Sequence, residues 1–338
     1  MAESPAHAWG MTVPLDGVPL AGHPELYREL ADMGYTDLWS TESNGADGFT
    51  PLALAAAAEP RLRLGTAIVS SFTRGPALLA QSAATMAAAA PGRFVLGLGA
   101  SSDVIVRRWN DIPFDKPYSR TRDVLQFLRA ALAGERVAHQ YDTFEVRGFR
   151  LSLVPRTPPK IMVAALRERM LRLAAREADG VILNWVSPQD VKRIAAIVHD
   201  ENPAAEIVAR IMVCPSPDSG AVRATVRPLV SGYFTVPVYR AYQAWLGHGE
   251  ALDAMWQAWD AGDRKAATAA VPDDIVDSVC VHGSPDECRE QLAGYISNGV
   301  TTPVMALLPG DLDIRDAVRR LAPPAHRPST STARPAQT

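Results

Sequence analysis

Cysteine is scarce in this chain of 338 residues, which has Cys214, Cys280 and Cys288 and no others. Three cysteines at irregular spacing cannot form the disulfide framework of a small secreted domain. No C-x-x-C pair occurs, so the usual signature of a structural zinc site is absent as well. We therefore expect a reduced protein that binds no metal.

Long apolar runs are also lacking. The alanine-rich stretch 52–58 is far shorter than the roughly 18 apolar residues that a membrane span requires. Residues 1–10 have neither the basic nor the apolar region of a signal peptide. The formal net charge of −3 leaves no basic face for nucleic acid or an anionic membrane. These absences predict a cytoplasmic protein that acts on a small molecule, with neither nucleic acid nor membrane as a partner.

Several catalytic motifs are missing. The nucleophile elbow G-x-S-x-G and the metalloprotease motif H-E-x-x-H do not occur, which excludes hydrolysis by those two routes. Gly97-Leu98-Gly99 resembles the start of a dinucleotide fingerprint, but Ser102 stands where the third glycine belongs. No acid-ended strand follows about 20 residues later. A Rossmann-type nucleotide site is therefore disfavoured.

The sequence does have a regular alternation of strand-like and helix-like segments, which is typical of parallel α/β architecture. Helix starts are well marked: Pro76 suits a first helical position, Ser187 suits an N-cap, and Ser284 with Glu287 forms a capping box. About eight strands are expected, the number that closes a (β/α)8 TIM barrel with its active site at the strand carboxyl ends. The expected strands are residues 9–13, 37–40, 62–69, 94–98, 160–164, 181–184, 207–213 and 303–308.

Three segments interrupt the alternation within a single barrel that we place at residues 1–322. Residues 136–159 predict a hairpin excursion, with strands at 141–146 and 149–154. Residues 215–277 predict a helical insertion before the last strand. Residues 323–338 are rich in Pro, Ser and Thr without apolar periodicity, and we expect this tail to be disordered.

Glycines at positions 65, 97 and 99 lie within two neighbouring expected strands. A glycine in a strand marks either a close approach of a planar ring or another backbone, or tight packing with a bend. The residues alone leave these two interpretations open.

Longer motifs add a family resemblance. G-Y-x-D-L-W-x-x-E from Gly34, L-R-L-G-T-A-I-V from Leu62, R-G-P-A-L-L-A-Q-x-A-A-T-M from Arg74 and G-R-F-V-L-G-L-G from Gly92 occur in this order. Together with residues 163–184, they resemble the luciferase-like monooxygenase superfamily, and are most similar to its members that use the deazaflavin coenzyme F420. The resemblance implies an oxidoreductase that transfers a hydride between F420 and a small organic substrate. Two alternatives stay open: an FMN-dependent monooxygenase using reduced flavin and oxygen, and a cofactor-binding barrel without catalysis.

The resemblance also implies cofactor contacts. A non-prolyl cis peptide bond that backs the central ring of the cofactor corresponds to Ala67–Ile68. The ring would be edged by the residues just after the fourth strand and would meet a polar side chain at the end of the sixth. These residues are Ala100, Ser101, Ser102 and Asn184.

A phosphate of the cofactor would bind where the helix after the fifth strand opens, at Ala165, Leu166 and Arg167. Free backbone N–H groups and the helix dipole favour an anion there. Arg167 or Arg169 could add a charge-assisted hydrogen bond, or could be a solvated surface side chain.

The proton donor is the least defined part of the site. Some relatives have an acid–histidine pair after the second strand, where this chain has Glu42 and Ser43. A glutamate that some relatives use after the fourth strand corresponds to Ser102. Glu42 could act as an acid if burial raises its pKa, or could simply bond to backbone groups. His282 is an alternative donor, or a structural histidine that ends an apolar run.

Aromatic residues provide candidate substrate contacts. Tyr233 and Phe234 could line a pocket, Trp39 is either a pocket wall or a barrel plug, and Trp109 lies in a loop that could cover the ring. Leu252, Met255, Trp256 and Trp259 fall on one helical face, which predicts core packing or a subunit interface. The resemblance makes a homodimer possible without requiring one.

Overall fold

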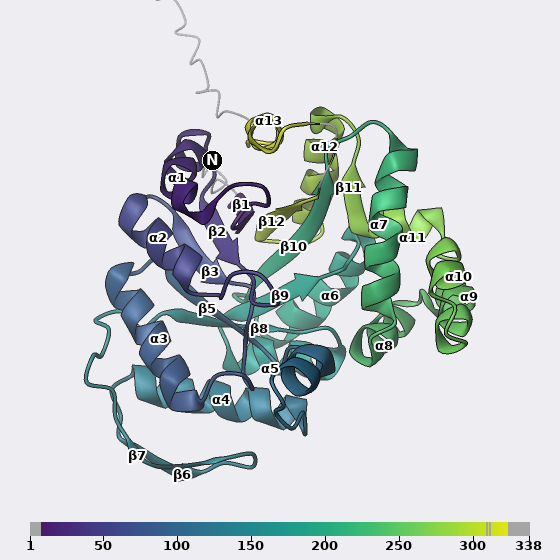
Figure 1. Ribbon diagram of the computed structural model, residues 1–338. Helices are drawn as coiled ribbons and strands as arrows, with labels where there is room; N and C mark the ends of the chain where they lie inside the picture. The colour runs from purple at the N-terminus through teal and green to yellow at the C-terminus, as the bar shows by residue number, and fades with distance from the viewer. Residues whose placement is uncertain (1–7, 309, 311, 324–338) are drawn as a thin grey trace, which may run out of the picture.

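The computed structural model describes residues 8–308, 310 and 312–323, and a closed barrel of parallel strands forms its centre (Figure 1). Strand β12 pairs with both β10 and β1, and β10 pairs with β9, so the sheet closes on itself. The (β/α)8 barrel expected from the alternation is therefore confirmed. The strands of the closed circuit are β1 (Gly10–Val13), β2 (Asp37–Ser40), β3 (Arg63–Thr66), β5 (Phe94–Gly99), β8 (Lys160–Ala164), β9 (Gly180–Asn184), β10 (Glu206–Cys214) and β12 (Thr302–Leu307).

Two short strands join this sheet at its carboxyl end. Strand β4 (Val69–Ser70) pairs with the end of β5, and β11 (Cys280–His282) pairs with the end of β10. The single strand expected at 62–69 is thus divided into β3 and β4, because the chain changes direction at Ala67 and Ile68. Strand β11 was not expected, since three residues between a helix and a turn are too few for an alternating pattern.

Helices surround the barrel, as Figure 1 shows. Helices α3 and α6 begin with Pro76 and Pro188 at the expected first positions, and α12 begins with Pro285. Ser187 and Ser284 each form a complete capping box, which confirms both predicted N-caps. The surrounding elements are η1 (Leu20–Gly22), α1 (His23–Asp32), α2 (Thr50–Ala58), α3 (Pro76–Ala89), η2 (Val104–Trp109), α4 (Pro117–Leu132), α5 (Glu168–Glu177), α6 (Pro188–Glu201), α12 (Pro285–Ser297) and α13 (Ile314–Arg320).

The barrel interior is filled by side chains and centres on Trp39. A Cβ atom at Gly65 would lie 2.3 Å from the Trp39 indole, and one at Gly97 would lie 1.8 Å from the carbonyl oxygen of Thr66. Tight packing therefore explains both glycines. The Trp39 side chain is fully buried and lies beneath the guanidinium of Arg63, at the amino end of the barrel. Trp39 is the barrel plug, and its assignment as a substrate contact is wrong.

Arg63 organises the amino-terminal rim of the barrel. Its Nε donates to Asp37 Oδ1 at 2.5 Å, its Nη1 to Glu206 Oε2 at 2.7 Å and its Nη2 to Thr302 Oγ1 at 2.8 Å. Lys160 also pairs with Glu206. One guanidinium thus connects four strands of the barrel and is itself fully paired.

The hairpin excursion is present with different bounds from those expected. Its strands are β6 (Val137–Gln140) and β7 (Glu145–Phe149), so the expected first strand at 141–146 contains the turn. Tyr141 and Phe144 stack at a centroid distance of 4.7 Å and both meet the ring of Phe127 on α4. Contact with this helix fixes the turn where the apolar pattern alone indicates a strand.

Five helices separate β10 from β11 and lie to one side of the barrel in Figure 1. They have a core of their own that includes Leu252, Met255 and Trp256, in agreement with the helical face expected there. Phe234 is fully buried in this core, so its assignment as a substrate contact is also wrong. The helices are α7 (Ser219–Phe234), α8 (Pro237–Leu246), α9 (Gly249–Asp260), α10 (Arg264–Ala269) and α11 (Asp273–Val279).

Among the described residues, none of the helices combines the length and the apolar character needed to cross a bilayer. The tail that we expect to be disordered lies outside the described residues, apart from Pro323.

Candidate functional site

A cavity of about 210 Å³ opens at the carboxyl ends of the barrel strands, where barrel enzymes place their active sites. Its walls come from β1 and the segment after it, from the loop after β2, and from β10 and β12. The lining residues are Thr12, Val13, Pro14, Leu15, Asp16, Thr41, Ser43, Asn44, Gly45, Ala46, Arg210, Ala306 and Leu307.

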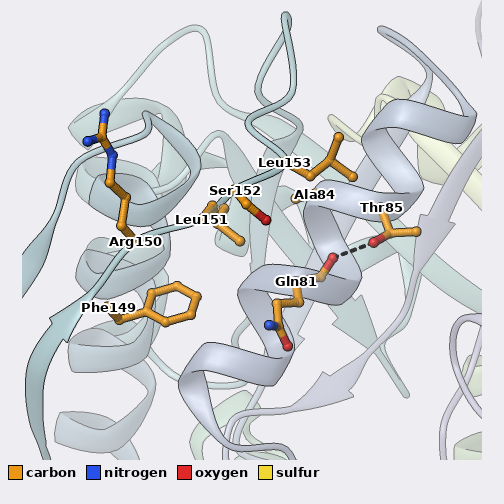
Figure 2. A pocket seen from close by; sticks show the side chains of 8 residues that line it. All are labelled: Gln81, Ala84, Thr85, Phe149, Arg150, Leu151, Ser152 and Leu153. Atoms are coloured by element: carbon orange, nitrogen blue, oxygen red, sulfur yellow. Dashed lines mark hydrogen bonds between the residues drawn. The ribbon is translucent and has the colours of Figure 1, made fainter.

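Figure 2 shows a second cavity, of about 280 Å³, between α3 and residues 149–153. Gln81, Ala84 and Thr85 line it from the helix, and the Thr85 hydroxyl donates to the Gln81 carbonyl oxygen at 2.8 Å. No barrel strand end contributes to this lining, so it does not share the position of a barrel active site. The cavity at the strand ends is the better candidate.

Several buried polar atoms cluster at this end of the barrel with no hydrogen-bond partner among the described residues. They are Thr12 Oγ1 on β1, Asn184 Oδ1 on β9, Trp185 Nε1 directly after β9, and Arg210 Nε on β10. Buried polar atoms in folded proteins are nearly always bonded, because an unmade bond costs about 1–3 kcal/mol. A cluster of such atoms beside a cavity indicates a place where a ligand supplies the partners.

Arg210 is the charged member of this cluster. Its nearest polar contact is weak: Nη1 lies 3.8 Å from the Sδ of Met212. Burial lowers the pKa of the guanidinium, while the phenols of Tyr233 and Tyr239 and the carboxylate of Asp16 act in the opposite direction. The guanidinium therefore lies in a desolvated place near two phenols, and the cavity reaches it.

Aromatic rings surround this cluster. Trp185 packs against Tyr233 at a centroid distance of 5.0 Å, and Tyr233 meets Tyr239 edge-on at 5.7 Å. Asn184 Nδ2 donates to the Tyr239 hydroxyl at 3.5 Å, and burial raises the pKa of Tyr239 to about 12. The Tyr239 hydroxyl therefore keeps its proton at neutral pH. The ring of Tyr233, which is 41% exposed, remains available as a substrate contact.

The backbone at the strand ends has unusual conformations. The Ala67–Ile68 peptide bond is cis, as the family resemblance implied. Ser101, just after β5, has φ of 67°, and Trp185, just after β9, has φ of 54°. Residues other than glycine seldom adopt this left-handed region, and when they do they cluster at functional sites. Two of the expected cofactor contacts have such conformations: Ile68 follows the cis bond, and Ser101 lies in the left-handed region.

The remaining expected cofactor contacts divide into two groups. Ala100 directly follows β5, Asn184 is the last residue of β9, and both are partly buried. The Ser102 hydroxyl already accepts from the Ile105 N–H at 3.3 Å. Ala165 is buried, and its N–H donates to the Ile182 carbonyl oxygen at 3.2 Å, so it is engaged in the barrel and not free for a phosphate.

Helix α5 begins at Glu168, two residues after the expected opening at Leu166, with Arg167 as its N-cap. Arg167 is exposed, and no side-chain cap is found at this end among the described residues. Leu166, just before it, is partly buried. The guanidinium of Arg169 lies over the ring of Tyr118, 3.8 Å from its centroid. The helix terminus thus has backbone N–H groups to offer, and Arg167 is the less engaged of the two arginines.

Glu42 is bound to neighbouring groups. Arg74 Nη2 donates to its Oε2 at 2.5 Å, and the Gly48 N–H donates to the same oxygen at 3.0 Å. This arrangement corresponds to the backbone-bonding alternative and holds the loop after β2 in place. Ser43 beside it is exposed and lines the cavity.

His282 ends β11 and is not among the residues that line the cavity. Its Nε2 lies 3.1 Å from Asp277 Oδ1. Hydrogen bonding from Arg223 holds the pKa of Asp277 below its usual value, and His282 adds to this effect. The histidine connects β11 to α11, which is a structural role. Trp109 is the last residue of η2, where a loop was expected; it is 54% exposed and is not among the residues that line the cavity.

Sequence reasoning missed several residues of the site, above all Arg210 and Asp16 of the cavity and Trp185 and Tyr239 beside it. One signal could have found Arg210: it is the only charge in the otherwise apolar run 207–213. A charged residue in a buried strand is uncommon and calls for a partner. Among the described residues, no group of three His, Cys, Asp or Glu side chains is placed to hold a metal ion.

The chain has clear relatives in sequence. The sequence model of the luciferase-like monooxygenase family matches residues 4–302. A Mycobacterium tuberculosis protein, whose name assigns it provisionally to the coenzyme F420-dependent oxidoreductases, is 28% identical over 323 residues. The match covers 85% of this chain and 91% of that protein.

Solved structures share the fold. Coenzyme F420-dependent tetrahydromethanopterin reductase from Methanopyrus kandleri has a TM-score of 0.77 at 19% identity, over 94% of this chain and 97% of that one. The oxygenating constituent of 3,6-diketocamphane monooxygenase from Pseudomonas putida, in complex with FMN, has a TM-score of 0.63 at 17% identity, over 89% and 92%. At these identities the likeness shows the fold alone. The family match covers most of the chain, and the chain therefore belongs to the luciferase-like monooxygenase family, as one of its enzymes.

Proposed function

We propose that this enzyme is an oxidoreductase that uses coenzyme F420 and transfers a hydride between this deazaflavin and a small organic substrate. The observation that carries the proposal is the cluster of buried, unpartnered polar atoms on Thr12, Asn184, Trp185 and Arg210 beside a cavity at the strand ends. The preference for F420 rests on the named Mycobacterium tuberculosis relative.

The described residues fit such a cofactor. Ala67 and Ile68 are partly buried directly after β3, beside Gly99, where a Cβ atom would already lie 3.0 Å from the Ile68 side chain. Because Gly99 has no side chain, the apolar surface at Ala67 and Ile68 is flat enough for a planar ring to lie against it. Ser101 and Asn184 would offer polar contacts at its edge. The opening of α5 at Arg167 and Glu168 would bind a phosphate through backbone N–H groups.

The protein contributes binding, orientation and exclusion of water. When bound, the deazaflavin ring supplies the hydride chemistry at its C5 atom. Trp185, Tyr233 and Tyr239 form an aromatic wall that would shield the reacting groups from solvent. The Tyr239 hydroxyl, whose pKa burial raises to about 12, holds its proton at neutral pH and would donate a hydrogen bond from Oη.

A fluorescence titration tests the proposal. The purified chain is added to F420 at fixed concentration, and the deazaflavin fluorescence is expected to change and saturate at micromolar protein. FMN and riboflavin are titrated in parallel as controls. Absence of any F420 signal, with a saturating FMN signal, would contradict the deazaflavin assignment.

The second candidate is an FMN-dependent monooxygenase on the same barrel. The specific observation in its favour is the fold likeness to the diketocamphane monooxygenase, which was solved with FMN. Oxygen uptake distinguishes the two, because a monooxygenase consumes oxygen in the presence of reduced FMN and substrate, and an F420 oxidoreductase does not. A barrel that binds cofactor without catalysis would show binding and no turnover with either cofactor.

A further inference from the structure

Arg210 differs from the paired arginines of the barrel. At the amino-terminal rim, Arg63 has Asp37, Glu206 and Thr302 as partners for its Nε, Nη1 and Nη2 atoms. At the carboxyl rim, the Nε of Arg210 is buried and bonds to none of the described residues, and its Nη1 has only a sulfur contact. No ion pair with a carboxylate of the described residues is found for Arg210, although Asp16 lines the same cavity and influences the guanidinium electrostatically.

An arginine stays charged in proteins, so it cannot escape burial by losing its proton. A buried charge without a partner destabilises the fold, and apolar residues of similar size are usually the more stable choice at such a position. A guanidinium that the fold leaves unpaired in a cavity is therefore set up for an anion that arrives from outside. A carboxylate fits best, because its two oxygens match the planar fork of the guanidinium.

The position of Arg210 separates it from the expected ring platform and phosphate site, while Asn184, the expected cofactor contact on β9, is its direct neighbour. Going round the barrel, the strands run β10, β12, β1, β2, β3, β5, β8 and β9. The cavity is lined from β10, β12, β1 and the loop after β2. The ring platform at Ala67 and Ile68 and the helix opening at Arg167 follow β3 and β8, on the other half of the circle. Arg210 faces the half that the cofactor leaves for the substrate.

The surroundings of Arg210 define the rest of the ligand. Thr12 Oγ1, in the same cavity, is a second buried polar atom without a described partner. Tyr233 and Tyr239 lie close enough to influence the guanidinium electrostatically, and Trp185 packs on Tyr233. The cavity of about 210 Å³ thus combines this one cation with hydroxyl groups, the carboxylate of Asp16 and apolar side chains, and the aromatic rings lie beside Arg210 outside the lining.

We propose that the substrate of this enzyme is a small carboxylate with an apolar or aromatic body, anchored by a bidentate ion pair with Arg210. This inference rests on the proposed function, since it assigns the substrate class of the same site. Arg210 is a specificity-determining residue: it holds the carboxylate and thereby orients the body of the substrate toward the ring of the cofactor.

The test uses benzoate as the probe and benzamide, which has the same shape without charge, as its matched control. Binding to the full-length chain is measured by calorimetry, with and without saturating F420. Benzoate is expected to bind at least tenfold more tightly than benzamide. Arg210→Met is expected to weaken benzoate binding by about tenfold to hundredfold, because one charge-assisted pair is lost, and to leave benzamide binding unchanged.

Two further variants make the test specific. Arg210→Lys keeps the charge and loses the planar fork of the guanidinium, so an intermediate loss of benzoate affinity is expected. This variant also provides the test if the Arg210→Met protein does not fold. Arg147→Met removes a positive charge from the exposed hairpin and is expected to leave benzoate binding unchanged. Equal affinity for benzoate and benzamide, or full benzoate binding by both Arg210 variants, would overturn the inference.

The two proposals fail separately. If Arg210→Met loses F420 affinity and benzoate binding is unaffected, Arg210 serves the cofactor and the substrate assignment is wrong. If the chain does not bind F420 but binds benzoate through Arg210, the carboxylate site stands and the cofactor assignment is wrong.

Discussion

Asn184 on β9 and Arg210 on β10 are direct partners in the parallel register of these strands, and each has a buried polar atom that bonds to none of the described residues. At the opposite rim of the same barrel, Arg63 and Asp37 are joined by a hydrogen-bonded ion pair of 2.5 Å. The charged groups around Arg63 at one rim are therefore paired within the protein, whereas Arg210 and several buried polar atoms at the other rim are not. This division matches the general property of barrel enzymes, in which one face provides stability and the other function.

Replacing Arg210 with Met is expected to stabilise the ligand-free protein. The substitution removes a desolvated charge that has no partner in the described part of the chain and replaces it with an apolar chain of similar length. We expect the free energy of unfolding to rise by about 1 kcal/mol. Urea denaturation of the ligand-free proteins measures this change in the free energy of unfolding. Arg210→Lys, which keeps the charge, should show no such gain, and a less stable Arg210→Met protein would mean that Arg210 has an internal stabilising role.

Replacing Arg63 with Met is expected to have the opposite effect. The Asp37 side chain is 2% exposed, so the substitution leaves a buried carboxylate without its main partner. The free energy of unfolding should fall by about 3–5 kcal/mol. Arg147→Met, on a side chain that is 84% exposed, is the matched control and should change it by less than about 0.5 kcal/mol. Equal small effects of the two substitutions would show that the amino-terminal rim does not stabilise the barrel.

The same rim predicts a dependence on pH. Burial acts to raise the pKa of Glu206, but Arg63 and Lys160 outweigh it, and the pKa lies below its usual value of 4.5. A carboxyl group with a lowered folded pKa contributes stability above its unfolded pKa and loses it as the pH falls through the folded value. In the wild type, the stability that ionised Glu206 contributes should therefore be lost as the pH falls below 4.5. Arg63→Met should move the midpoint of acid unfolding to higher pH, as followed by circular dichroism, and an unchanged midpoint would exclude this coupling.

Much of the fold could be predicted because apolar runs and cap signals coincide. Ser187 and Ser284 mark their helices correctly, and the eight barrel strands follow from runs of buried residues. The hairpin could not be placed, since Tyr141 and Phe144 read as strand residues and only their contacts with Phe127 on α4 make them a turn. Such contacts join residues that are distant in sequence, and no local pattern encodes them.

The backbone features of the site were predictable. The family resemblance implied the cis bond at Ala67–Ile68, and the sequence placed a helix opening near Arg167. Side-chain partners were not predictable in this way. The engagement of Glu42 with Arg74 joins residues 32 positions apart. Arg210 stands in an apolar strand, and a shift of one residue in register would place its side chain on the other face.

Replacing Gly97 with Ala is expected to distort the barrel. Its Cβ would lie 1.8 Å from the backbone oxygen of Thr66, which cannot move without breaking the pairing of β3. We expect a loss of at least about 3 kcal/mol in the free energy of unfolding, at the upper end of overpacking costs. Gly75→Ala is the control, because nothing lies within 4 Å of its Cβ and its φ of −60° suits any residue. A Gly97→Ala protein as stable as the Gly75→Ala protein would refute tight packing as the reason for this glycine.

Arg167 and Arg169 are expected to contribute unequally to cofactor binding. Arg167 is exposed at the N-cap of α5, while the guanidinium of Arg169 is engaged over the Tyr118 ring. Arg167→Gln should weaken F420 binding about tenfold, which corresponds to one charge-assisted hydrogen bond to a phosphate, and Arg169→Gln less than threefold. Fluorescence titration at two salt concentrations measures both, and the Arg167 effect should shrink at high salt because exposed charges are screened. FMN also carries a phosphate, so the same contrast is expected if FMN is the cofactor. Equal losses for the two variants would place the phosphate away from the helix terminus.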